Sequence, residues 1–164
     1  MYRRILVPLD GSQLAEAALP HAVAMASRFQ ASLTLLQVVT PVTFAATMDP
    51  LTASAAEVTL AMEAEEDSEK GAEKYLGEVV QRPEMKDIPV QTEVVEGVAA
   101  MKIVRRAKAG DVDLIVMSTH GRSGIRRLMF GSVADQVLRE AGLPILLIRP
   151  KEQHEEVPSE ENAS

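Results

Sequence analysis

The sequence contains no cysteine and no tryptophan, and aromatic residues make up only 3% of its 164 positions. Without cysteine the chain forms no disulfide bonds or cysteine zinc sites, and it has no thiolate for catalysis. A pocket for a nucleobase would have to use aliphatic side chains and backbone groups, because rings for stacking are scarce. The core must therefore consist of Leu, Ile, Val, Ala and the eight methionines.

An excess of positive charge is also lacking, since the formal net charge is −7. Neutralisation of phosphates by Lys and Arg supplies most nonspecific affinity for nucleic acid, so we expect no nucleic-acid partner. No apolar run approaches the ~20 residues of a membrane helix, and we expect no membrane partner. The first twelve residues do not resemble a secretory signal. We therefore expect a cytoplasmic protein.

Five short segments are predicted to be β-strands. Four are nearly continuous apolar runs, as expected for strands that are covered on both faces of a parallel sheet. These runs are residues 5–7, 33–39, 114–117 and 145–148. The fifth segment, residues 90–95, alternates more between apolar and polar side chains, which predicts a strand nearer an edge.

Helical patterns alternate with these strands. Ser12 is predicted to cap the first helix, which reaches Phe29 with a kink or a weakened turn near Pro20. Further helices are expected at about 54–81, at 98–109, and from Ser132 to just before Gly142. This alternation predicts one α/β domain over residues 1–150, with a doubly wound, five-stranded parallel sheet and helices on both faces.

Three segments are predicted to carry no such element or no specific chemistry. Residues 40–53 are expected to form an irregular loop, and the polar, acidic tail at 151–164 is expected to be disordered. The acidic run from Glu63 to Glu69 is interpreted as the solvated face of the second helix.

Parallel sheets of this kind bind ligands beyond the carboxyl ends of their strands, where the strand order reverses. The loops to consider follow the first and fourth strands. The second of these, Ser118 to Ser132, is rich in glycine and arginine: it contains Gly121, Gly124, Gly131, Arg122, Arg126 and Arg127. Gly131 and Ser132 then open a helix, whose free N–H groups favour anions. A simple connection with solvated arginines is the alternative, but the location favours a phosphate-binding loop.

This loop resembles the signature of the universal stress protein family, which is glycine, two residues, glycine, nine residues, glycine, then serine or threonine. Gly121, the spacer 122–130 and Gly131-Ser132 match it, whereas Ser118 replaces the first glycine. The resemblance extends from ILVPLDGS through LTLLQVV to PILLIRP, over about residues 2 to 150. The Cβ of Ser118 would either crowd a ligand, or its hydroxyl would replace a contact.

The resemblance implies five parallel strands in the order 3-2-1-4-5, with ATP lying across the first and fourth strands together with Mg²⁺. Asp10 would lie near the ribose with Pro8 beside the nucleoside, and the Val38 backbone would meet adenine. The other implied contacts are Met117 and Ser118 at the base and ribose, and Gly121, Arg122, Gly131, Ser132 and Val133 around the phosphates.

Family members look like homodimers that are joined through their last strands, which implies pairing through Leu143 to Arg149. A short apolar strand at a sheet edge favours the same pairing. The implied function is that of a sensor or regulator in stress adaptation, whose surface changes for an unidentified protein partner when ATP binds.

No residue is predicted to be catalytic and no metal is predicted to have protein ligands. A Gly-Lys-Ser/Thr phosphate loop is absent, so at most slow ATP hydrolysis is expected. His120 is expected to orient the loop by hydrogen bonding. Two alternatives stay open: a dimeric interaction module that binds no ATP, and a slow adenine-nucleotide hydrolase.

Overall fold

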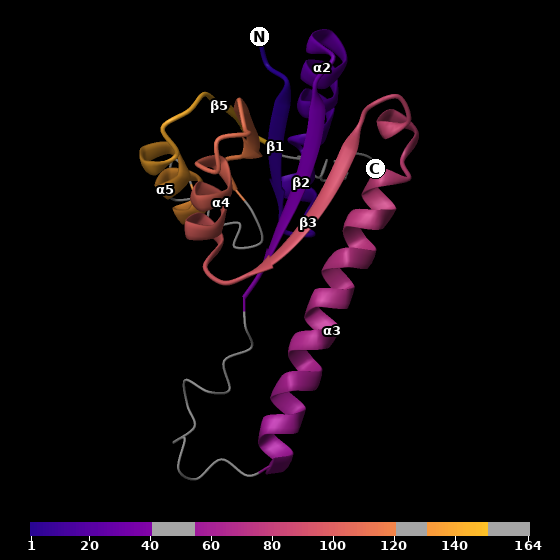
Figure 1. Cartoon of the computed structure of the whole chain (residues 1–164), viewed down its shortest axis with the longest axis vertical. Helices are drawn as coiled ribbons and strands as arrows, with labels where there is room; N and C mark the ends of the chain where they lie inside the picture. Colours follow the sequence, from indigo (N-terminus) through magenta and orange to yellow (C-terminus); the bar gives the residue numbers. More distant parts are fainter. Residues whose placement is uncertain (41–54, 121–130, 151–164) are drawn as a thin grey trace, which may run out of the picture.

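The computed structural model describes residues 1–40, 55–120 and 131–150, without the side chains of 55–62 and 65. A five-stranded sheet has the order β3-β2-β1-β4-β5, and the four strand pairs are all parallel (Figure 1). Its strands are β1 (Arg4–Leu9), β2 (Ser32–Val39), β3 (Val90–Glu96), β4 (Leu114–Ser118) and β5 (Ile145–Ile148). The predicted fold class and strand order are confirmed, and β3 is the edge strand that its alternation predicted.

Helices cover both faces of this sheet. The connecting elements are α1 (Gln13–Glu16), α2 (Leu19–Phe29), α3 (Ala55–Val80), the 3₁₀ helix η2 (Pro83–Met85), α4 (Ala99–Ala107) and α5 (Ser132–Glu140). One core contains Ile5 and Val7 of β1 with residues of α1, α2 and α3. The opposite core contains Leu6 with residues of α4 and α5. Successive residues of β1 thus feed two separate cores, which explains why the strand is apolar throughout.

The first predicted helix is two helices. Ser12 caps α1, since its side-chain oxygen accepts the Ala15 N–H at 3.1 Å, as expected. Pro20, the second residue of α2, has no N–H to donate to the carbonyl of Glu16 four residues earlier. The helix therefore stops after Glu16 and starts again at Leu19, where a kink or a weakened turn had been expected.

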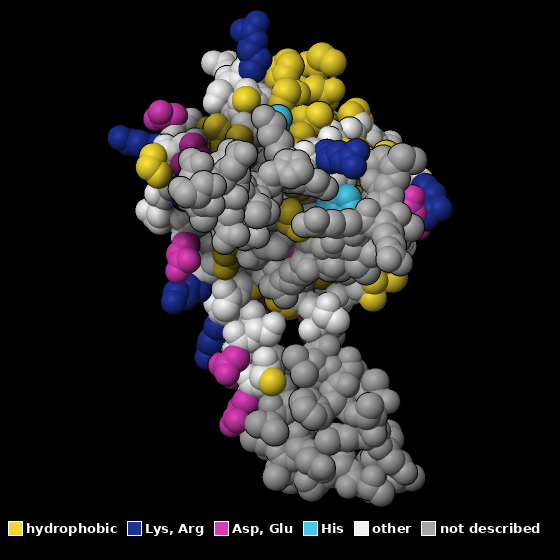
Figure 2. Space-filling view, turned by 180° about the vertical axis from the view of Figure 1, so that it is seen from behind, with side chains coloured by type: hydrophobic (Ala, Val, Ile, Leu, Met, Phe, Trp, Pro, Cys, Tyr) yellow, Lys and Arg dark blue, Asp and Glu magenta, His cyan; other side chains and the backbone are white. Residues whose placement is uncertain are grey.

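Helix α3 is long and charged on its outer side. Side chains of both signs follow it in Figure 2. Two ion pairs on this helix are Glu66–Lys70 and Lys74–Glu78. Glu63, Glu66 and Asp67 are exposed, in agreement with a solvated face. Among the described side chains of α3, Ala72, Leu76 and Val79 belong to the core. None of the described helices is long and apolar enough to cross a membrane.

The hydrogen-bonded pairings of β1 with β2 and with β4 end at different residues of β1, and this opens a crevice between β1 and β4. Pairing with β2 continues to Leu9, but pairing with β4 stops at Leu6. The Arg4 carbonyl accepts the Asp113 N–H at 2.9 Å. The backbone N–H and C=O groups of even-numbered β1 residues therefore point toward β4. The next residue on that side is Pro8, which has no N–H with which to continue the ladder. The strands β1 and β4 therefore separate at the predicted switch point.

Candidate functional site

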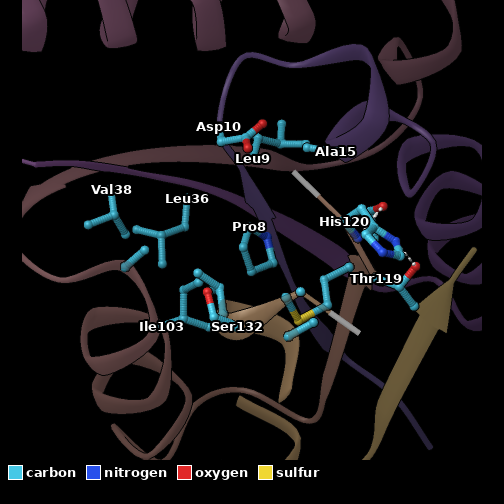
Figure 3. A pocket seen from close by; sticks show the side chains of 16 residues that line it. Pro8, Leu9, Asp10, Ala15, Leu36, Val38, Ile103, Thr119, His120 and Ser132 are labelled. Carbon is cyan, nitrogen blue, oxygen red and sulfur yellow. Dashed lines mark hydrogen bonds between the residues drawn. The ribbon is translucent and has the colours of Figure 1, made fainter. Parts of the chain in front are cut away.

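A pocket of ≈ 230 Å³ lies in this crevice at the carboxyl ends of β1, β2 and β4. Helices α4 and α5 line it on one face of the sheet. Asp10, which directly follows β1, and Ala15 of α1 also line it. Figure 3 shows Leu36 and Val38 on one side of the pocket and Thr119 and His120 on the other, with Pro8 between them. The volume is near the lower end of the ~300–1,000 Å³ of typical ligand pockets.

The pocket brings together eight of the ten residues that the sequence predicted for the site. They are Pro8, Asp10, Val38, Met117, Ser118, Gly131, Ser132 and Val133. The other two, Gly121 and Arg122, lie outside the described residues, as do Gly124, Arg126, Arg127, the 41–54 segment and the 151–164 tail. The contacts that each residue makes with a ligand stay a prediction.

Asp10 is fixed by the turn that leads into α1. Its Oδ1 accepts the Ser12 hydroxyl at 2.6 Å and the Ser12 N–H at 2.9 Å. Gly11 makes this turn possible with a φ of 80°, a left-handed conformation that favours glycine. The carboxylate therefore has a defined position at the rim of the pocket before any ligand binds.

Ser118 is turned toward its own chain. Its side chain is buried, and its hydroxyl accepts the His120 N–H at 3.3 Å. The hydroxyl thus helps to shape the end of β4, which neither of the two sequence-based alternatives for this residue had considered. Thr119 Oγ1 lies 3.0 Å from Nδ1 of His120. That this histidine orients the loop stays a prediction, because residues 121–130 lie outside the described residues. His120 Nε2 is buried, and no hydrogen-bond partner is found for it within the described part of the chain.

Thr119 ties three elements together below the pocket. Its N–H donates to the carbonyl of Ile148 on β5, and its own carbonyl accepts the Gly131 N–H, both at 2.8 Å. The residues that enter and leave the 121–130 segment are therefore held side by side. Gly131 is also the N-cap of α5, and its φ of −66° is ordinary.

The N-terminus of α5 faces the pocket without a side-chain cap. The N–H groups of Ser132 and Val133 belong to the first helical turn, where a helix offers them no carbonyl acceptor. Such groups, together with the positive end of the helix dipole, bind anions. Ser132 is exposed, so its hydroxyl is accessible as a further donor.

The opposite end of the pocket is apolar, with one backbone acceptor. Leu36, Val38, Ala99 and Ile103 line it. The Ser32 N–H donates to the Arg3 carbonyl at 2.9 Å, so the backbone N–H and C=O groups of even-numbered β2 residues point toward β1. Because β1 pairs with β2 only as far as Leu9 and Gln37, the ladder supplies no partner for the Val38 carbonyl. This carbonyl can therefore accept a hydrogen bond from a ligand.

Sequence reasoning missed the wall that α4 contributes, namely Ala99 and Ile103. The apolar face of this helix was visible in the sequence. That this face also borders the pocket beside Leu36 and Val38 depends on how α4 packs on the sheet. Among the described residues, no group of three or more His, Asp or Glu side chains is arranged to hold a metal ion.

Comparisons with known proteins agree on one family. The model of the Universal stress protein family matches residues 1–149. Universal stress protein MJ0531 of Methanocaldococcus jannaschii is 34% identical over 154 residues, which cover 93% of this chain and 86% of the relative.

Solved structures share the fold. Universal stress protein UspA from Lactobacillus plantarum superposes with a TM-score of 0.76 at 28% identity, covering 90% of this chain and 98% of its own. A universal stress protein in complex with cAMP has a TM-score of 0.57 at 19% identity, with 92% and 98% covered.

Proposed function

The chain belongs to the universal stress protein family, and from this premise we propose that it is a cytoplasmic, dimeric sensor or regulator that binds ATP with Mg²⁺ in the pocket between β1 and β4. The observation that carries the proposal is the division of this pocket. An apolar slot with a backbone acceptor lies at β2 and α4, and an uncapped helix N-terminus lies at α5. A nucleotide has the same division between base and phosphates.

The base end favours adenine over guanine. The 6-amino group of adenine is a donor, which suits the Val38 carbonyl, whereas the 6-oxo group of guanine would place an acceptor against an acceptor. A site built to pair with a ligand donor rejects ligands that leave its buried acceptor unpaired. Leu36 and Ile103 provide aliphatic contacts for the base. The known complex of a related fold with cAMP supports the view that this fold accommodates adenine nucleotides.

The ribose and phosphates have matching groups. The Asp10 carboxylate, which Ser12 orients, is an acceptor of the kind that ribose hydroxyls need. The N–H groups of Ser132 and Val133 would bind phosphate, with Gly121 and Arg122 contributing from outside the described residues. Mg²⁺ usually keeps several waters and phosphate oxygens as ligands, so it needs no cluster of protein carboxylates.

We assign no catalytic residue, and propose slow ATP hydrolysis at most. The described pocket side chains include one carboxylate, Asp10, which accepts two bonds from Ser12, and one histidine, His120, whose Nδ1 contacts Thr119. Each contacts a hydroxyl, but the orienting carboxylate of a catalytic triad is lacking among the described residues, since His120 Nε2 has no hydrogen-bond partner there. Binding would instead change the surface around the pocket, which an unidentified protein partner would recognise.

Thermal unfolding with and without nucleotide tests this function. ATP with Mg²⁺ at ~100 times its dissociation constant should stabilise the fold by about 2.7 kcal/mol. GTP at the same concentration should produce a much smaller shift, because of the Val38 carbonyl. No shift with ATP, together with no nucleotide released from denatured protein, would leave only the dimeric interaction module. Release of phosphate over many turnovers, measured at the same ATP concentration, would favour the adenine-nucleotide hydrolase instead.

A further inference from the structure

We propose that Glu16 is a positioning residue for the pocket: Arg82 and Tyr75 hold its carboxylate, and Glu16 thereby sets, through α1, the place of Asp10. The three side chains are called the Glu16 clamp below. None of them lines the pocket. The role of Glu16 rests on the proposed function only in its second test, which uses ATP as the ligand.

Helix α1 has few other anchors. It contains four residues, of which only Ala15 is buried. Isolated helices shorter than ~12–15 residues are marginal in water, so α1 does not hold itself in place. The break before Leu19, caused by Pro20, also removes the support that a continuous helix would have given. The position of α1 must therefore come from contacts of its side chains.

The Glu16 clamp supplies such contacts from a distant part of the chain. Arg82 Nη1 donates to Glu16 Oε2 at 2.8 Å and its Nη2 donates to Oε1 at 2.9 Å, so the pair is bidentate. The Tyr75 hydroxyl also donates to Oε1, at 2.9 Å. Charge-assisted bonds of this geometry are among the strongest that side chains form. Since Tyr75 belongs to α3 and Arg82 follows it, α1 is attached to the longest described helix.

The link from Glu16 to Asp10 is short. Glu16 follows Ala15, which lines the pocket and whose N–H donates to the Ser12 side chain at 3.1 Å. The Ser12 hydroxyl in turn donates to Asp10. The segment from Asp10 to Glu16 is thus held by the cap at one end and by the clamp at the other.

The pKa values of the clamp residues agree with a tight contact. Hydrogen bonding from Arg82 lowers the pKa of Glu16, against the effect of burial. Burial, followed by the hydrogen bond to Glu16, raises the pKa of Tyr75. Glu16 is therefore ionised at neutral pH and Tyr75 keeps its donor proton.

A second arginine–glutamate pair in the chain provides a matched control. Arg106 Nε donates to both carboxylate oxygens of Glu93, at 3.0 and 2.7 Å. The side chains of Glu16 and Glu93 are similarly exposed, at 23% and 29%. Glu93 lies on β3 and does not line the pocket. Glu93→Gln therefore removes an arginine–glutamate contact at a site with no predicted link to Asp10, while Arg106 keeps its bonds to Asp111.

The first test needs no ligand. Hydrogen exchange of the backbone amides from Ser12 to Ala18 should become about tenfold faster in Glu16→Gln, and less so in the milder variant Tyr75→Phe. Glu93→Gln should leave these amides unchanged. If Glu16→Gln and Glu93→Gln give the same local exchange, Glu16 does not position α1 and the proposal is wrong.

The second test measures ATP binding by calorimetry. Glu16→Gln should weaken binding by about tenfold, whereas Glu93→Gln should not change it. In an Asp10→Asn background the further loss caused by Glu16→Gln should largely disappear, because the two residues act through one segment. Undiminished loss in that background would overturn the proposed route. A wild-type protein that binds no ATP would instead overturn the proposed function, and the exchange experiment would still decide the role of Glu16.

Discussion

At the scale of single residues, Gly131 shows how closely the described residues on either side of the 121–130 segment approach each other. A Cβ at this position would lie 3.1 Å from the Thr119 carbonyl oxygen, tighter than an ordinary contact. The same oxygen accepts the Gly131 N–H at 2.8 Å. Since the φ of Gly131 is ordinary, the position requires glycine for space and not for its backbone freedom.

Replacing an α-hydrogen of Gly131 with a methyl group, as in an alanine variant, should therefore move α5 away from β4. Gly131→Ala is expected to destabilise the fold by about 1 kcal/mol and to reduce ATP binding markedly, because the Ser132 and Val133 N–H groups move as well. Denaturant unfolding and calorimetry measure the two effects. Gly77→Ala is the control, since nothing lies within 4 Å of its added Cβ; this helical change should stabilise by roughly 0.5–1 kcal/mol and leave binding unaltered.

Residue roles were predictable from the sequence where they depend on local chemistry. The Ser12 cap and the position of Asp10 follow from a few neighbouring residues, and the structure contains both. The Glu16–Arg82 pair joins residues 66 positions apart, and no local pattern indicates it. The direction of the Ser118 hydroxyl likewise depends on how the chain turns after β4.

At the scale of secondary-structure elements, β1 is a central strand that contains a proline. Prolines are normally confined to edge strands because they lack an N–H for the ladder. Here Pro8 lies on the side where β1 and β4 have already separated, so the missing donor leaves the remaining ladder intact. The proline is thus compatible with a central strand only at the carboxyl end, next to the pocket.

Pro8→Ala restores a backbone N–H that faces β4. We expect this donor to extend pairing between β1 and β4 and to narrow the crevice, since a buried N–H without a partner is costly. The variant should be at least as stable as the wild type but bind ATP more weakly, and hydrogen exchange should show protection of the new amide. An unprotected amide with unchanged ATP affinity would contradict this account.

Elements and their order were predictable because hydrophobic periodicity and strand–helix alternation are strong signals. All five strands lie where they were expected, within a few residues at their ends. The separation of α1 from α2 was expected as a kink or a weakened turn and not as a break, since the effect of Pro20 depends on whether neighbouring contacts restore the missing hydrogen bond. The wall formed by α4 depends on packing, which periodicity does not specify.

At the scale of the whole molecule, β5 is an edge strand with unequal sides. The Pro144 carbonyl accepts the Ile115 N–H, and the Ile148 carbonyl accepts the Thr119 N–H. The backbone N–H and C=O groups of even-numbered β5 residues therefore point toward β4. The N–H groups of Ile145 and Leu147 consequently point away from the sheet. A short apolar strand with outward donors can pair with a second copy, as proposed for the dimer.

Leu147→Pro should separate association from folding. It removes an outward N–H and leaves the ladder with β4 intact, so the variant is expected to be a folded monomer. Sedimentation and circular dichroism measure the two properties, with Leu147→Ala as a control that keeps the N–H. A folded dimer of the proline variant would show that the subunits associate elsewhere.

The chain has two tyrosines and no tryptophan. One of them, Tyr75, belongs to the Glu16 clamp through its hydroxyl. The other, Tyr2, packs edge-on against Phe29 with ring centroids 5.3 Å apart. The tyrosine absorption and emission of this protein therefore come from two rings in different surroundings. The protein carries a built-in optical reporter beside α1, and movements of that helix can be followed without attaching a label.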